Sequence, residues 1–392
     1  MGRVIGVTGN EAVANALRQA NPDVCAAYPI TPATDIMQRF SGYVADGLVK
    51  TELILVESEH SAMSACVGAS AAGGRVITAT SSQGLALMWE ILFIAAGDRL
   101  PIVMPLVNRA LSAPINIHAD HSDGMGARDT GWIQLWSENA QEAYDNTLQA
   151  FRISERMDIR LPSMVCLDGF IISHCIERLE YLEDDEARRF VGEHAQLHPL
   201  LDIDHPVSYG PLILSDLYME YKRAHHEVMS RVSNVVLDVA ADFEKITGRK
   251  YGLFDSYRLD DAEIALVILN SAAGTAKDVV DDYRARGVKA GLLKPRLFRP
   301  FPYGEVADAL RTAKAVCVLD RADSFGGFGP MYMEIASALM TRGGRPALIN
   351  KIYGLGGRDF LPEHAELVLQ ELIDVASTGK VTSFKEYIGV KE

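Results

Sequence analysis

The chain has 392 residues, more than the roughly 100–200 residues of one domain, and this length predicts two domains with separate cores. Apolar residues make up 48% of the chain and charged residues 23%, as in ordinary soluble globular proteins. Its 38 Lys and Arg and 52 Asp and Glu give a net charge of −14, which argues against nucleic acid or an anionic membrane as partner, because both require basic patches.

Apolar runs of strand length alternate with helical patterns, which predicts an α/β fold built on parallel sheets. In the first half we expect helices at 11–18, after Pro32, from Ser58 and at 85–96, and a long polar loop at 110–131. The strands expected there are residues 1–7, 24–28, 53–56, 76–80, 102–107 and 163–167.

Residues 176–250 are more charged and predict a mostly helical elaboration of the first domain, with two extended pieces near Pro199 and Pro206. A new α/β series follows, so we place the domains at residues 1–250 and 251–392. The strands expected in the second domain are residues 264–269, 290–293, 315–319 and 347–352.

The five cysteines are too sparse for a metal site. The shortest spacing is nine positions and no C-x-x-C pair occurs, so neither zinc nor an iron–sulfur cluster is expected on this chain alone. We expect buried free thiols in a reducing compartment. The N-terminus is too short for a signal h-region, and the longest apolar stretch, at 84–97, is too short for a membrane span. The sequence therefore predicts a cytoplasmic protein.

The segment Tyr28-Pro-Ile-Thr-Pro32 follows a predicted strand. Thr31 suits a helix N-cap and Pro32 suits the first helical position. Ligands of open parallel sheets bind outside the carboxyl ends of the strands, so the Thr31 hydroxyl could receive a carboxylate there. The alternative is a capped turn without a ligand.

Glu57 and Glu59 lie at the next strand-to-helix junction. The helix dipole favours a carboxylate at this place without any ligand. The functional alternative is a buried glutamate that hydrogen-bonds a ligand nitrogen. Glu59 suits that role better than Glu57, because small residues follow it and leave room.

Arg109 ends a predicted apolar strand. An arginine is costly to bury unless it is paired, so it either meets a structural carboxylate or awaits a substrate anion. In the loop His118-Ala-Asp-His121-Ser-Asp123, two His and two Asp resemble metal ligands, but no catalytic zinc spacing occurs, and we favour a solvated or interface loop. The motif Gly354-Leu-Gly-Gly357 lacks the third glycine of a dinucleotide fingerprint.

Short motifs spread over residues 5–370 occur together, in this order, in one family. The set resembles the alpha chains of the 2-oxoacid:ferredoxin oxidoreductases, in particular those of pyruvate:ferredoxin oxidoreductase. The motifs are Tyr28-Pro-Ile-Thr-Pro32, Ser58-Glu59, Thr80-Ser-Ser-Gln-Gly84, Asn108-Arg-Ala-Leu111, Asp120-His-Ser-Asp123, Asp168-Gly-Phe170, Leu293-Lys-Pro-Arg-Leu-Phe-Arg-Pro-Phe-Pro302, Leu319-Asp-Arg321 and Gly354-Leu-Gly-Gly-Arg-Asp359.

The resemblance implies that the first domain binds the pyrimidine of thiamine diphosphate and that the second resembles the transketolase C-terminal domain. The enzyme would oxidatively decarboxylate pyruvate with coenzyme A, reduce ferredoxin, and run in reverse as pyruvate synthase. A beta subunit would hold the cofactor diphosphate, Mg²⁺ and a [4Fe–4S] cluster. A delta subunit would hold two more clusters, and a gamma subunit would complete the complex.

The resemblance also implies roles for individual residues. Glu59 would hydrogen-bond the pyrimidine ring nitrogen, and Arg109 with the Thr31 hydroxyl would hold the substrate carboxylate. Tyr28, Pro29 and Ile30 would shape the wall near the cofactor. An oxalate-using relative carries arginine at the position of Thr31, so a threonine favours pyruvate. Other 2-oxoacids (2-oxoglutarate, a branched-chain 2-oxoacid or oxalate) stay as alternatives, as does a non-catalytic scaffold subunit. A nicotinamide-dependent dehydrogenase is excluded because the fingerprint is missing.

Overall fold

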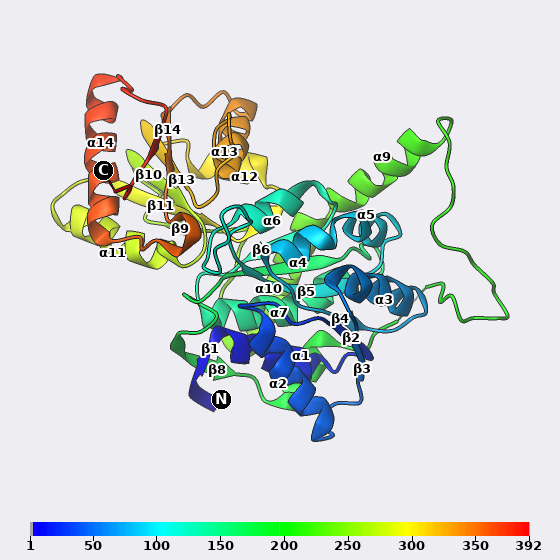
Figure 1. Cartoon of the computed structure of the whole chain (residues 1–392). Coiled ribbons are helices and arrows are strands. Elements are labelled where there is room, and N and C mark those ends of the chain that lie inside the picture. Colours follow the sequence, from blue (N-terminus) through cyan, green and yellow to red (C-terminus); the bar gives the residue numbers. More distant parts are fainter. Residues whose placement is uncertain (1–2, 196, 392) are drawn as a thin grey trace.

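A computed structural model describes residues 3–195 and 197–391. It contains two large sheets covered by helices. Figure 1 shows the part that follows residue 260 (yellow to red) above and to the left of the N-terminal part. The neighbouring strands in the centre of both sheets are parallel, which confirms the predicted α/β class.

Among the described residues, the first sheet has seven strands, of which only the edge strand from residue 297 is antiparallel to its neighbour. In spatial order the strands are β12 (Leu297–Arg299), β6 (Ile133–Trp136), β7 (Ser163–Asp168), β5 (Ile102–Asn108), β4 (Val76–Ile77), β2 (Val24–Ala27) and β3 (Glu52–Leu55). Strand β5 is buried throughout, because helices cover both faces of the sheet. Strands β6 and β12 lie outside every predicted strand, whereas β2, β3, β4, β5 and β7 confirm predicted ones.

The helices of the first part are α1 (Gly9–Ala20), α2 (Thr34–Ala45), α3 (Glu59–Ala71), α4 (Ser82–Leu87), α5 (Trp89–Gly97), α6 (Ser122–Gly126) and α7 (Ala140–Ser154). The predicted start of α2 is wrong, since residues 31–33 form a turn in which Ala33 N–H donates to the Ile30 carbonyl, so Thr31 is not the N-cap. The helix predicted at 85–96 is two helices, divided at Met88.

The first strand, β1 (Arg3–Thr8), is not part of the parallel sheet. It pairs antiparallel with β8 (Ile176–Tyr181) in a separate two-stranded sheet, and residues 1 and 2 of its predicted range lie outside the described residues. The capping box of Thr8 and Glu11 starts α1 directly after β1. Beyond β8 lie α8 (Asp184–Val191), α9 (Tyr218–Met229) and α10 (Val232–Thr247). The region predicted to be mostly helical, 176–250, therefore holds three helices, but strand β8 and the non-helical residues between α8 and α9 make up much of the rest.

The second sheet has six strands among the described residues: β15 (Lys385–Tyr387), β14 (Ala347–Ile352), β13 (Ala315–Asp320), β10 (Ile264–Ile268), β11 (Ala290–Pro295) and β9 (Phe254–Tyr257). Its helices are α11 (Ala272–Ala285), α12 (Tyr303–Ala309), α13 (Pro330–Thr341) and α14 (Pro362–Thr378). One apolar cluster joins the two sheets, with Leu92 and Met104 from the first part and Val267 and Val316 from the second. The domain boundary near residue 250 stays a prediction.

The cysteines correct one expectation. Cys25, Cys66, Cys166 and Cys317 are buried free thiols as predicted, but Cys175 is exposed at the end of the turn before β8. Within the described part of the chain, no helix has the length and apolarity needed to cross a membrane.

Candidate active site at the carboxyl edge of the first sheet

Several polar residues lie where neighbouring parallel strands of the first sheet end. Thr31 follows β2, Glu59 begins the helix after β3, and Arg109 follows β5. The carboxyl ends of parallel strands meet at one edge of a sheet, which is where ligands of such folds bind. The structure therefore brings the predicted residues to the same edge.

Glu59 is a buried residue whose carboxylate meets no partner in the described part of the chain. The helix that it begins is capped by Ser58, whose hydroxyl accepts from the Ser61 N–H at 3.2 Å. The Glu59 side chain is 7% exposed, and no hydrogen bond or ion pair reaches its carboxylate from the described residues. Glu57, in contrast, is exposed and accepts from the Ser61 hydroxyl at 2.6 Å. Burying a carboxylate without a partner is costly, so Glu59 is suited to a ligand that donates a hydrogen bond.

Helix α4 forms a close wall against Glu59. A Cβ atom on Gly84 would lie 2.4 Å from the Thr80 hydroxyl oxygen and 2.7 Å from a carboxylate oxygen of Glu59. These oxygens share one small volume that only glycine leaves free. The Thr80 hydroxyl is buried and has no hydrogen-bond partner among the described residues. The wall fixes where the Glu59 carboxylate can lie.

Arg109 and Thr31 are in direct contact. The Arg109 guanidinium donates from Nη1 to the Thr31 carbonyl at 2.9 Å and from Nε to the Asn116 carbonyl at 3.0 Å. Its side chain is only 6% exposed, and burial lowers the pKa of Arg109, with nearby Asp123 acting in the opposite sense. No carboxylate of the described residues forms an ion pair with the guanidinium. A buried cation held by neutral oxygens is available to an anion.

Asp123, which was not predicted as a site residue, holds the backbone around Arg109. One carboxylate oxygen accepts from the N–H groups of Arg109 at 3.0 Å and Ser82 at 2.9 Å. The other accepts from the Asn108 amide at 2.8 Å and from Gly124 N–H. Burial raises the pKa of Asp123 to about 7, against the effect of these four hydrogen bonds. Asp123 thus ties the end of β5 to the start of α4, and the motif at 120–123 was its only signal in the sequence.

Asp168, at the end of β7, joins the first sheet to the second. Its fully buried carboxylate contacts His121 at 2.8 Å and Arg321 at 3.1 Å, and it accepts from the Ser271 hydroxyl and the Asn270 amide. Burial by itself raises the pKa of Asp168, but Arg321 and His121 outweigh burial and hold that pKa below its usual range. In the sequence, Asp168, His121 and Arg321 belong to separate motifs, and no motif includes Asn270 or Ser271.

The loop at 110–131 is exposed to solvent at residues 112–115, 117 and 118, as expected for a solvated loop, but it is largely buried from Ala119 on. Three of its side chains are buried and hydrogen-bonded: Asp120 accepts from Ser122 N–H, His121 contacts Asp168, and Asp123 accepts from Arg109 N–H at the end of β5. Part of the loop folds into α6. Throughout residues 3–195 and 197–391, no group of three His, Cys, Asp or Glu side chains is arranged to hold a metal ion.

The glycine motif at 354–357 packs against this same loop. Gly357 has a φ of +82°, donates its N–H to the Ala119 carbonyl at 2.7 Å, and a Cβ on it would lie 2.3 Å from that of His118. The glycine therefore allows two backbones to approach closely.

The remaining predicted residues lie at the surface beside Thr31. Tyr28 is 36% exposed and Pro29 is exposed. Ile30 is half-buried and packs against the apolar cluster that contains Met37 and Phe40 of α2. They connect β2 to the turn that precedes α2. Their open position leaves them accessible to a ligand or to another chain.

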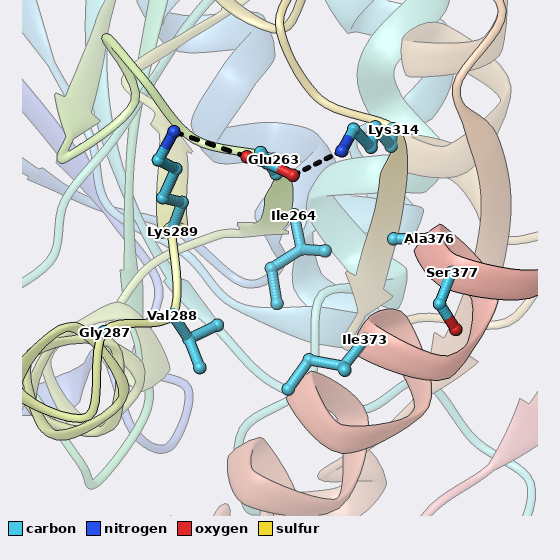
Figure 2. A pocket seen from close by; sticks show the side chains of 9 residues that line it. All are labelled: Glu263, Ile264, Gly287, Val288, Lys289, Lys314, Ile373, Ala376 and Ser377. Carbon is cyan, nitrogen blue, oxygen red and sulfur yellow. Dashed lines mark hydrogen bonds and ion pairs between the residues drawn. The ribbon is translucent and has the colours of Figure 1, made fainter.

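A hollow of about 340 Å³ lies in the second sheet, at the edge where its parallel strands begin (Figure 2). Glu263, Lys289 and Lys314 line it at the amino ends of β10, β11 and β13. Figure 2 shows Glu263 between the two lysines and paired with both, so its single negative charge offsets part of their positive charge. This is not the edge at which parallel sheets bind ligands.

Two family models match the sequence. The model for pyruvate flavodoxin/ferredoxin oxidoreductase, thiamine diphosphate-binding, covers residues 15–241. The model for pyruvate:ferredoxin oxidoreductase core domain II covers residues 262–365.

Relatives match over nearly the full length. Pyruvate synthase subunit PorA of Thermotoga maritima is 53% identical over 388 residues, which are 99% of this chain and 98% of the relative. Ketoisovalerate oxidoreductase subunit VorA of Pyrococcus abyssi is 40% identical over 390 residues, which are 98% of this chain and 97% of the relative.

A solved structure has the same fold. The 2-oxoglutarate:ferredoxin oxidoreductase from Magnetococcus marinus, determined with 2-oxoglutarate, coenzyme A and succinyl-CoA bound, superposes with a TM-score of 0.70 at 21% identity. The match covers 94% of this chain and 65% of that one, so this chain spans about two thirds of that protein's length. Since both family models match in chain order and the relatives match over almost every residue, the chain belongs to the pyruvate:ferredoxin oxidoreductase family.

Proposed function

We propose that the chain is the alpha subunit of an enzyme that oxidatively decarboxylates pyruvate with coenzyme A. The products are acetyl-CoA and carbon dioxide, ferredoxin takes up the two electrons, and the reaction is reversible. The observation that carries the proposal is Glu59, a buried residue whose carboxylate has no hydrogen-bond or ion-pair partner among the described residues and lies at the carboxyl edge of the sheet. The 53% identity to a pyruvate synthase subunit supports the choice of reaction.

The residues around Glu59 fit the pyrimidine of thiamine diphosphate. When bound, this cofactor supplies a carbanion that attacks the 2-oxo group and an electron sink for decarboxylation. Glu59 would share a proton with a ring nitrogen of the cofactor, which supplies the partner that its carboxylate lacks. Gly84 would keep the carboxylate in place, because the space beside it is too small for any side chain.

Arg109 and Thr31 would bind the substrate. The Arg109 guanidinium, which already donates to the Thr31 carbonyl, would make a charge-assisted contact with the carboxylate of the 2-oxoacid, and the Thr31 hydroxyl would complete it. The Thr31 side chain is small and neutral, which leaves room for a methyl ketone and offers no second cation to a dicarboxylate. Tyr28, Pro29 and Ile30 would form the adjoining wall.

Partner subunits would complete this site. The five dispersed cysteines of this chain offer no iron–sulfur cluster site, so we assign the [4Fe–4S] clusters, Mg²⁺ and the cofactor diphosphate to beta and delta subunits, with gamma completing the complex. Two family matches, ending at 241 and beginning at 262, support a domain boundary near residue 250. The free thiols support a reducing, cytoplasmic location.

The test is made on the purified complex. We expect bound thiamine diphosphate and pyruvate-dependent reduction of a viologen dye that requires coenzyme A. The variant Glu59→Gln should abolish the reduction while the complex still assembles. Normal turnover by this variant would remove Glu59 from the mechanism, and a wild-type complex without cofactor or turnover would favour a scaffold subunit.

A branched-chain 2-oxoacid is the second candidate substrate. The specific observation is the 40% identity to a ketoisovalerate oxidoreductase subunit over 98% of this chain. One methylene of pocket depth changes kcat/KM by roughly 10- to 200-fold, so kcat/KM for pyruvate, 2-oxoglutarate and 2-oxoisovalerate separates the candidates. A higher kcat/KM for 2-oxoisovalerate than for pyruvate would reverse our assignment.

A further inference from the structure

The described residues of the segment 192–217, which are all but residue 196, project from the body between α8 and α9, and we call them the arm. The described residues of the arm form neither helix nor strand. Figure 1 shows it in green, standing off from the body beside α3 and α5 and returning to α9. Its first residues are held to the body, since the Gly192 carbonyl accepts from Arg75 at 2.8 Å and the Ala195 carbonyl accepts from Arg160 at 2.5 Å. Farther along, Leu200 N–H donates to the Ala71 carbonyl at 2.8 Å and Gly210 N–H donates to the Asp98 carboxylate at 3.3 Å.

The arm exposes large apolar side chains. Ile203 is 89% exposed and Leu212 is 90% exposed. Leu201, Leu214 and Leu217 are also exposed, and Met219 continues the series into α9. Soluble monomers rarely expose large contiguous apolar patches, and those that occur mark interaction sites.

The same apolar surface leads back toward the active site. Phe93 and Ile94 of α5 line a hollow of about 340 Å³ together with Leu212 of the arm and Tyr218 of α9. Helix α5 follows directly on α4, whose Gly84 lies against Glu59. Leu87 and Trp89, at the junction of these two helices, are exposed as well. A chain that covers the site can therefore continue over α5 onto the arm.

The charge of the arm narrows the choice of occupant. No Lys or Arg occurs between Arg189 and Lys222, whereas Asp202, Asp204 and Asp216 lie within the arm. An acidic, apolar arm is complementary to an apolar groove with a basic rim. A second copy of this chain is disfavoured, because two arms facing each other would repel and the whole chain carries −14.

We propose that the arm and the exposed face of α5 form one docking surface for the partner subunit that completes the active site. The arm lies in an apolar groove of that subunit, and Lys and Arg side chains flank the groove. This inference rests on the proposed function, which requires such a subunit. It adds the surface that holds the subunit and the chemistry of the groove that receives the arm.

The test uses the complex purified with its partner subunits. The double variant Leu212→Asp/Leu214→Asp places charges where we expect the groove to be apolar. Central interface residues of this kind change affinity by about 30-fold or more, so we expect the partner subunit to be lost on dilution and gel filtration. The matched control is Met340→Asp, which is 73% exposed on α13, and it should leave assembly intact. An arm variant that assembles as tightly as the control would overturn the proposal.

Hydrogen–deuterium exchange on the wild-type protein tests the same surface without a mutation. Backbone amides at residues 212–217 should be protected in the complex and exchange fast in the separate full-length chain. Equal exchange in both would refute docking. If light scattering shows that the separate chain is a dimer that the double variant dissociates, the occupant is a second copy and the proposal is wrong. Dye reduction and bound cofactor are measured in parallel. A wild-type complex without turnover refutes the proposed function, and the gel-filtration and exchange data still test whether the arm binds the partner subunit.

Discussion

The substitution Gly84→Ala tests whether α4 positions the Glu59 carboxylate. The new Cβ would lie 2.4 Å from the Thr80 hydroxyl oxygen, 2.7 Å from a carboxylate oxygen of Glu59 and 2.9 Å from its Cγ. Contacts below 3.0 Å are not tolerated, so at least one of these two side chains must move. The Thr80 hydroxyl can rotate, whereas a shift of Glu59 moves the group proposed to bind the cofactor.

Two opposing terms set the expected change in stability. Alanine in a helix interior is favoured over glycine by about 1 kcal/mol, whereas overpacking in a close-packed site costs about 1–3 kcal/mol. The free energy of unfolding should therefore fall by at most about 2 kcal/mol. The effect on catalysis should be larger, because a displacement of a reacting group by about 1 Å can lower the rate roughly 100-fold.

The matched control is Gly68→Ala in α3, the helix that Glu59 begins. A Cβ on Gly68 meets no atom within 4 Å, so this variant should gain up to about 1 kcal/mol and keep full activity. The assays are urea unfolding of the chain, thiamine diphosphate binding by calorimetry, and dye reduction by the assembled complex. Unchanged cofactor affinity and wild-type turnover in Gly84→Ala would refute the view that this wall positions Glu59.

Three further predictions address the buried network. In Asp123→Asn the new NH₂ group faces hydrogen-bond donors, so the free energy of unfolding should fall by about 3 kcal/mol, as measured by urea unfolding. The KM for pyruvate should rise in steady-state kinetics, because the backbone N–H of Arg109 loses its carboxylate acceptor. An unchanged KM would contradict the anchoring role of Asp123. The folded-state pKa of Asp168 is lowered, so its stabilising contribution is present above the unfolded pKa of about 3.9 and is lost as pH falls through the folded value. Arg321→Gln should therefore destabilise by about 3–5 kcal/mol at neutral pH and shift acid unfolding to higher pH, as followed by circular dichroism; an unshifted acid transition would contradict this. Thr80→Val removes a buried hydroxyl that has no hydrogen-bond partner among the described residues, so the free energy of unfolding should rise by about 1 kcal/mol in urea unfolding. A fall of about 1 kcal/mol instead would show that the hydroxyl is hydrogen-bonded.

Local sequence was sufficient for most of the secondary structure and failed in identifiable places. The buried strand β5 was predicted because a continuous apolar run indicates a strand covered on both faces. Strand β6 was missed because its sequence, Ile-Gln-Leu-Trp, follows the polar stretch at 110–131 and includes a polar residue, so no continuous apolar run marks it. The start of α2 was predicted two residues early, since a threonine before a proline is typical of a helix start and also of a turn.

The sequence by itself determined which residues stand at strand ends, since the alternation of strands and helices is a local pattern. It therefore placed Thr31, Glu59 and Arg109 each shortly after a predicted strand, and the pairing of those strands puts them at one sheet edge. Only the tertiary structure decided which of them is buried and what each one touches. Arg109 meets carbonyl oxygens rather than a carboxylate, and Asp168 gathers His121 and Arg321 from distant parts of the chain. The physical reason is that burial and partner choice depend on long-range packing, which no local periodicity encodes.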